Sequence, residues 1–185
     1  LGGAEDVTGI TWDQGGTNQA LTLVRAHPTV DDLKLELWRL VAPVSGTKTL
    51  RVTSSGTNAA SKDIAAGLTI FTGVDQTTPT SGVADAEGTS VTPTINITSA
   101  TGDIVLDALS AGEASTATGA GQTERYLTDI GSKASKGSTE AGAATVTMSH
   151  TIALSAIWRT YTASSPTRFL NKKFLGSVTE YCTAN

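Results

Sequence analysis

The side chains that could carry out acid–base or nucleophilic chemistry are few in this sequence. Two histidines occur, His27 and His150. His150 follows the same alternation as Val146, Met148 and Ile152, so we expect it to face the core as a hydrogen-bonded structural residue. His27 stands at the end of an expected strand with no nucleophile pattern beside it. Because the sequence also lacks a Gly-x-Ser-x-Gly motif and a usable Cys/His spacing, it predicts no nucleophilic catalyst.

Paired carboxylates are the second route to catalysis, since a glycosidase needs two of them. The pairs close in sequence are Asp31 with Asp32, Asp85 with Glu87, and Asp103 with Asp107. We expect the first two pairs to lie in turns, where acidic side chains form local hydrogen bonds. The third pair brackets an expected strand and shares one face at a period of two. A solvated or structural role is favoured for all three, and a catalytic role for the third pair is the alternative.

No cofactor is predicted from the ligand-bearing residues. Two histidines and one cysteine cannot complete a zinc site. Calcium is the alternative, because loops rich in Asp and backbone oxygen bind it, and Asp75, Asp85 and Glu87 are the candidates. No EF-hand spacing supports them. The segment 119–121 lacks the further glycine and the helix of a dinucleotide site.

Aromatic residues could stack on sugars. We expect Trp12, Trp38 and Trp158, which fall in predicted strands, to pack in the core, and Tyr126, near a predicted loop, to be more open. Residues 96–98 read Asn-Ile-Thr, an N-glycosylation sequon that falls inside an expected strand.

Composition limits the classes of partner. The net charge is −4 and the pI about 5.1, whereas nucleic-acid binding needs a basic face. The sparse basic group is Arg159, Arg168, Lys172 and Lys173, which we interpret as a solvated patch. Because no apolar run approaches the roughly 20 residues of a membrane helix, no membrane insertion is predicted. Cys182 is the single cysteine and is expected to be an idle thiol.

We expect many short strands to position these residues. Charged residues make up only 16%, and Thr, Ser, Gly and Ala are abundant. Alternating or continuous apolar runs at 7–12, 33–37, 104–109 and 144–152 predict strands, and about ten in total are expected. Trp38 breaks the alternation, which indicates a bulge or a second covered face. Residues 112–121 predict a loop, and a short helix is allowed near 169–174.

Five segments, taken in order, resemble a known module. They are residues 35–43, 71–79, 102–107, 119–123 and 142–149. Together they are similar to a jelly-roll module of the concanavalin and laminin-G type, which recurs in phage virion proteins and bacterial surface proteins. The resemblance covers residues 7–162. It implies a fold and a setting, and it carries no catalytic motif.

The two ends depart from that module. Its members have one or two further strands before the region of Val7, so we hypothesise that a neighbouring chain or the tail fills the gap by strand addition. The tail, residues 164–185, follows a sandwich domain of residues 1–163 and is apolar enough to pack on the domain or on a neighbouring subunit. The predicted subunit contacts are Leu1, Val7, Phe169, Leu170, Phe174, Leu175 and Tyr181.

These observations predict an all-β, jelly-roll-like antiparallel sandwich without enzymatic activity. The expected function is that of a structural protein of a virion or extracellular surface assembly, such as a capsid decoration, fibre or pilus-like subunit. Its partners would be copies of itself or other surface proteins. A carbohydrate-binding adhesion module with glycan partners is the alternative, and a glycan-cleaving enzyme that uses Asp107 is a third hypothesis.

Overall fold

The computed structural model describes residues 7–27, 33–55 and 62–182, and for residues 62–63 and 167–182 it describes the backbone alone. Every regular element in these ranges is a β-strand. The strands are β1 Val7–Trp12, β2 Gln19–Ala20, β3 Thr22–Ala26, β4 Leu33–Leu40, β5 Leu50–Ser54, β6 Lys62–Val74, β7 Gly82–Ser90, β8 Thr94–Ile97, β9 Ile104–Ala111, β10 Ser115–Thr118, β11 Thr123–Ile130, β12 Lys133–Ala141, β13 Val146–Ile152, β14 Ala156–Ser165 and β15 Thr167–Cys182. Over the same ranges no helix is long and apolar enough to cross a membrane.

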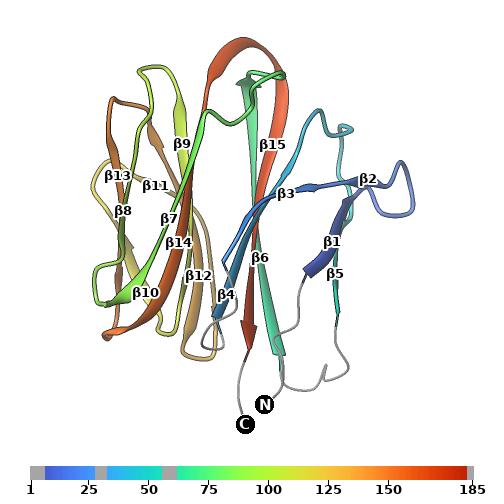
Figure 1. Cartoon of the computed structure of the whole chain (residues 1–185). Helices are drawn as coiled ribbons and strands as arrows, with labels where there is room; N and C mark the ends of the chain where they lie inside the picture. Colours follow the sequence, from blue (N-terminus) through green and yellow to red (C-terminus); the bar gives the residue numbers. More distant parts are fainter. Residues whose placement is uncertain (1–6, 28–32, 56–61, 183–185) are drawn as a thin grey trace.

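The strands form four antiparallel sheets. Each is named here after one of its strands: the β1 sheet has the order β2-β1-β5, the β4 sheet β3-β4-β15-β6, the β9 sheet β11-β12-β9-β14-β7, and the β13 sheet β10-β13-β8. Figure 1 shows them stacked as layers, with the β13 sheet on the left, then the β9 sheet, the β4 sheet and the β1 sheet. The all-β sandwich class expected from the sequence is confirmed, with more layers than a simple sandwich.

Three apolar layers hold the stack together. The first joins the β1 and β4 sheets and contains Ile10, Trp12 and Trp38. The second joins the β4 and β9 sheets and contains Leu35, Leu37, Leu106, Ala108, Tyr161 and Ala163. The third joins the β9 and β13 sheets through Ile95, Ile97, Val105, Val146 and Met148.

The two inner sheets are covered on both faces. All residues of β4 but one are buried, and β9 is buried throughout except at its first residue. Trp38 breaks the alternation because its face of β4 is covered by the β1 sheet, which confirms the second of the two explanations offered by the sequence. The bulge that was the other explanation also occurs, on β3 between Leu23 and Arg25, opposite Trp38. A strand that is covered on both faces must bury any polar residue that it carries. The polar candidate site residues on these strands are therefore buried.

Strand predictions succeeded where the apolar pattern was strong. The runs at 7–12, 104–109 and 144–152 correspond to β1, β9 and β13. The predicted loop at 112–121 was wrong in part, because β10 lies inside it and pairs with β13. The allowed helix near 169–174 was also wrong: this segment belongs to β15, which pairs with β4 on one side and β6 on the other.

Candidate functional site

A buried polar network lies between the β9 and β13 sheets. Asp107 on β9 is its centre, and the Oδ2 atom of its carboxylate lies 2.6 Å from Nε2 of His150 on β13. Ser138, on the neighbouring strand β12, donates to Oδ1 from its backbone N–H at 2.8 Å and from its hydroxyl at 2.6 Å. All three residues are no more than 3% exposed. The expectation that His150 faces the core as a hydrogen-bonded residue is confirmed.

Gln122 closes this network at its half-buried end. Its Nε2 donates to the Ser138 hydroxyl at 2.6 Å, and its Oε1 accepts from the backbone N–H of Ser149 at 2.8 Å. The network therefore links β9, β12 and β13 through one side chain each. These hydrogen bonds join β9 to its neighbour β12 and also join β9 to β13. They therefore fix the position of the β13 sheet on the β9 sheet.

The three residue types of a serine-hydrolase triad are present here in the wrong order. In a triad the histidine lies between serine and aspartate, because it must take the proton of the nucleophile. Here Asp107 lies between Ser138 and His150, and the serine hydroxyl donates to the carboxylate. Nδ1 of His150 is buried and has no hydrogen-bond partner among the described residues. The arrangement binds two sheets together and offers no substrate access.

A second group of ionisable residues lies where the edge strands β3 and β7 meet. Arg25 on β3 forms an ion pair with Asp85 on β7. The His27 ring stacks on the Tyr161 ring with centroids 4.6 Å apart. Nδ1 of His27 lies 3.9 Å from a carboxylate oxygen of Glu87. The NH2 group of Arg159 lies 3.7 Å from the same oxygen. Together these contacts bridge the β4 and β9 sheets.

Burial controls the protonation of this group. It lowers the pKa of His27, and the positive charge of Arg159 lowers it further, against the opposing effects of Asp85 and Glu87. Burial, followed by the charge of Asp85, raises the pKa of the Tyr161 phenol. Both side chains are therefore held neutral at pH 7. A neutral imidazole beside a neutral phenol, each at most 5% exposed, favours packing over proton transfer.

A shallow groove lies between the start of β7 and the end of β8. It has a volume of about 490 Å³, and its polar lining is Ser81, Asn96, Thr98, Ser99 and Asp103. The Asp103 carboxylate accepts from the hydroxyls of Ser164 at 3.1 Å and Ser99 at 3.4 Å. No aromatic side chain and no second carboxylate belongs to this lining. The groove can hold a small polar group, but it lacks the paired acids of a glycosidase.

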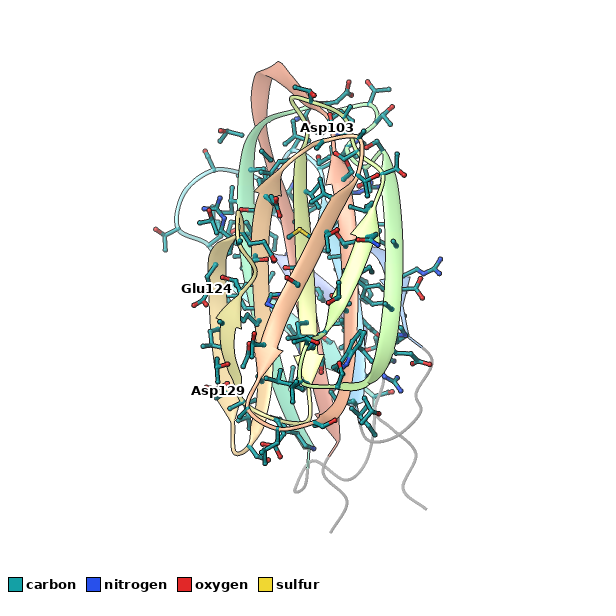
Figure 2. All side chains as sticks on the ribbon, turned by 90° about the vertical axis from the view of Figure 1, so that its left-hand side faces the viewer. Asp103, Glu124 and Asp129 are labelled. Carbon is teal, nitrogen blue, oxygen red and sulfur yellow. The ribbon has the colours of Figure 1, made fainter. Side chains whose placement is uncertain are left out.

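The structure gives the two acids of the third predicted pair different surroundings. Asp103 lines the groove, whereas Asp107 is 2% exposed inside the β9 sheet. Asp85 and Glu87 lie in β7 and not in a turn, so that prediction was wrong; their neighbours Ala84 and Ala86 face the core, and the acidic side chains alternate with them. Asp31 and Asp32 lie outside the described residues. Other acids are scattered as well, for Figure 2 shows Asp103 far from Glu124 and Asp129 along the molecule.

The tryptophans pack in the core, as expected. Trp12, Trp38 and Trp158 are 6–8% exposed, and their indole N–H groups donate to Val44 O, Glu36 and Ser90, respectively. Tyr126 lies in β11 and is more open than the tryptophans, as expected. Its half-buried ring lies against Gly67 of β6 and Gly137 of β12. The sequence-predicted sugar-stacking residues therefore do not form an exposed platform.

The calcium candidates are not brought together. Asp75 accepts from the backbone N–H groups of Thr77 and Thr78 at 2.7 and 2.8 Å, and so stabilises its own turn. Asp85 is engaged by Arg25. In the part of the chain that the structure describes, no three His, Cys, Asp or Glu side chains group closely enough to hold a metal ion.

The predicted subunit contacts are only partly described. Val7 is 7% exposed and packs in the layer between the β1 and β4 sheets. Leu1 lies outside the described residues, as do the side chains of Phe169, Leu170, Phe174, Leu175 and Tyr181. Of the basic group, Arg159 is 2% exposed, and the side chains of Arg168, Lys172 and Lys173 are likewise outside.

Sequence reasoning missed the partners of Asp107. Asp107 interrupts a continuous apolar run, and His150 stands at an inward position of an alternating strand. Because buried polar groups need hydrogen-bond partners, these two positions could have predicted the pair. Ser138 gave no such signal, because β12 consists mainly of small polar residues. No family model, no curated protein and no solved structure matches this chain.

Proposed function

We propose that this protein is a non-enzymatic structural subunit of a virion or extracellular surface assembly, with a jelly-roll-related sandwich as its building unit. Capsid decoration, fibre and pilus-like subunits are the members of this class. The observation that carries the proposal is the sealed Asp107–His150–Ser138 network. The residues best equipped for hydrolysis are no more than 3% exposed and serve as a connection between layers.

Two further features support this function. Buried charges are paired within single sheets as well: Lys34 and Glu36 pair at 2.8 Å along β4, and Lys136, which is 1% exposed, reaches Glu124 on the neighbouring strand β11 at 2.9 Å. Such internal connections suit a rigid part that must keep its shape. The second feature is a row of exposed apolar residues on β6, formed by Ile64, Leu68 and Ile70, which suits contact between subunits.

The test is the native mass of the purified protein by light scattering over a range of concentrations, followed by electron microscopy. A ring, a filament or a stable multimer of the 18.9 kDa chain is expected. A monomer at all concentrations, together with hydrolysis of a chromogenic glycoside that Asp103→Asn abolishes, would contradict the proposal.

A carbohydrate-binding adhesion module is the second candidate. The observation in its favour is the groove at Asp103, whose amide, hydroxyl and carboxylate groups could hydrogen-bond to a sugar. Its lining lacks an aromatic ring, so affinity would rest on hydrogen bonds and on contact with small apolar side chains such as Val83. A glycan array probed with the wild-type protein and with Asn96→Ala separates the candidates: binding that the substitution removes would favour the adhesion module.

A further inference from the structure

The β1 sheet covers the outer face of the β4 sheet over β4, whereas the described residues leave that face exposed over β6. Strand register establishes which residues share that face. Trp38 of β4 and Leu68 of β6 are both opposite Gly176 of the intervening strand β15. Leu40 and Ile70 are likewise both opposite a single β15 residue, Phe174. Because directly paired residues point to the same face of an antiparallel sheet, Leu68 and Ile70 lie on the face of Trp38 and Leu40.

Exposure differs sharply along these rows. Trp38 and Leu40 are each 8% exposed, under the β1 sheet. Leu68 is 36% exposed and Ile70 56%. Ile64, at the other end of the same row of β6, is 38% exposed. We call Ile64, Leu68 and Ile70 the β6 ledge. It is a strip of the same apolar face that the β1 sheet covers over β4.

The β1 sheet is one strand too narrow to reach the ledge. The chain passes from β2 to β3 through the single buried residue Leu21, so these two strands mark a shared edge of the two sheets. From that edge the outer layer reads β2-β1-β5 and the inner layer β3-β4-β15-β6. Among the described strands, β6 therefore has no counterpart in the outer layer. Figure 1 shows β1 and β5, with β2 outside them, beside the β4 sheet.

The edge of β5 is available for pairing. Among the described residues β5 pairs with β1 alone, through Val52 with Ile10 and Leu50 with Trp12. Leu50 and Val52 are half-buried and point toward the core. The open edge of β5 and the β6 ledge are the two sides of one slot: the first offers backbone hydrogen bonds, and the second offers apolar contact.

We propose that this slot accepts one extended strand from another subunit of the assembly. The inference rests on the proposed structural function and names its joint. The added strand pairs with β5, widens the β1 sheet to match the β4 sheet, and covers Ile64, Leu68 and Ile70 with apolar side chains at every second position. The ledge spans residues 64–70, so a strand of about seven residues, ~20 Å long, fills it.

The geometry favours a single strand over direct pairing of two β1 sheets. If β5 of one copy paired with β5 of a second copy, the two outer sheets would be continuous. Each inner sheet would then place its own β6 strand in the space below the joint. The continuous outer sheet spans too few strands there to make room for both β6 strands. Neighbouring strands need about 4.8 Å each, so the two β6 strands would collide. A slot one strand wide therefore takes a donated segment.

The probe is a short peptide of alternating valine and threonine flanked by lysines, titrated into the full chain by isothermal calorimetry or fluorescence anisotropy. We expect saturable binding. The same peptide with a central proline should not bind, because proline cannot extend the ladder. Ile70→Lys should weaken binding by about tenfold or more, since it places a charge under the strand. Leu154→Lys, at a residue 63% exposed outside this strip, is the matched control and should leave binding unchanged.

Circular dichroism and urea midpoints establish that both variants fold, and Leu68→Gln serves as a milder second variant. Absence of saturable binding at millimolar peptide would overturn the proposal, and so would equal binding by wild type and Ile70→Lys. Light scattering reports separately on the structural function. A multimer that does not bind the peptide refutes the slot while keeping the function, and a monomer that binds it through the ledge keeps the slot while refuting self-assembly.

Discussion

Asp107 and His150 are joined by a 2.6 Å contact between strands of two different sheets, and both are buried. The carboxylate also takes two hydrogen bonds from Ser138, which satisfies Oδ1. A buried carboxylate is tolerated only when its lone pairs are engaged in this way. The pair is therefore a structural joint of the β9 and β13 sheets, and its removal should act on stability.

Substitution of Asp107 tests that role. Asp107→Ala would leave His150 Nε2 and the Ser138 hydroxyl buried without their acceptor, and we expect a loss of about 2–4 kcal/mol in the free energy of unfolding. Asp103→Ala is the control, because the hydroxyls of its partners Ser99 and Ser164 lie 2.7 Å apart and stay hydrogen-bonded to each other, and it should cost about 1 kcal/mol or less. Urea denaturation measures both. Equal effects of the two substitutions would refute a special role for Asp107.

The sequence revealed the strands that carry this joint but only half of the joint itself. β9 and β13 are visible as apolar patterns, and they carry Asp107 and His150. β12 has no large apolar residue, since it reads Lys-Ala-Ser-Lys-Gly-Ser-Thr-Glu-Ala. Its middle is nevertheless buried, because small side chains allow close sheet packing. A hydrophobic period cannot report burial achieved by small polar residues.

Two glycines make room for one aromatic ring. A Cβ on Gly67 would lie 2.1 Å from Cζ of Tyr126, and one on Gly137 would lie 2.2 Å from its Cε1. Gly67→Ala should therefore destabilise the protein by about 1–3 kcal/mol through overpacking. Gly9→Ala, where a Cβ meets nothing within 4 Å, is the matched strand control and should be nearly neutral.

A double-mutant cycle identifies the cause of that loss. In a Tyr126→Ala background the ring is absent, so Gly67→Ala should cost far less than it does in the wild type. Thermal or urea unfolding of the four proteins supplies the cycle. An unchanged cost would mean that the glycine is required for the backbone of β6 and not for the ring.

The lowered pKa of His27 predicts a pH dependence of stability. Above its unfolded value of about 6.5 the imidazole is neutral in both states, so it contributes no slope. As the pH falls below that value, the unfolded chain takes up a proton before the folded chain does, and stability falls until the folded pKa is passed. The free energy of unfolding of wild type minus that of His27→Gln should therefore decrease between pH 7.5 and pH 5. A difference that stays constant or increases on acidification would contradict the burial of a neutral imidazole.

The burial of the three tryptophans distinguishes a structural subunit from a sugar-stacking module. At 6–8% exposure, with each indole N–H bonded inside the protein, their emission should be blue-shifted and weakly quenched by iodide. Titration with oligosaccharides should leave this emission unchanged. Strong quenching, or a spectral shift on addition of a glycan, would show an exposed indole and favour the adhesion module.

Lys34 and Glu36 form a buried ion pair, and removing one of the two charges should cost more stability than removing both. Their charged atoms lie 2.8 Å apart with side chains 9% and 4% exposed, and Glu36 also accepts from the indole of Trp38 at 2.7 Å. Lys34→Met strands a buried carboxylate and should cost about 3–5 kcal/mol. The double variant Lys34→Met/Glu36→Gln removes both charges while the amide oxygen keeps the bond to Trp38, so it should regain most of that loss. Equilibrium unfolding of the single and double variants measures both effects. If the double variant is less stable than Lys34→Met alone, the charge of Glu36 stabilises the β4 sheet by itself. The ion pair with Lys34 would then not be the reason that Glu36 is buried.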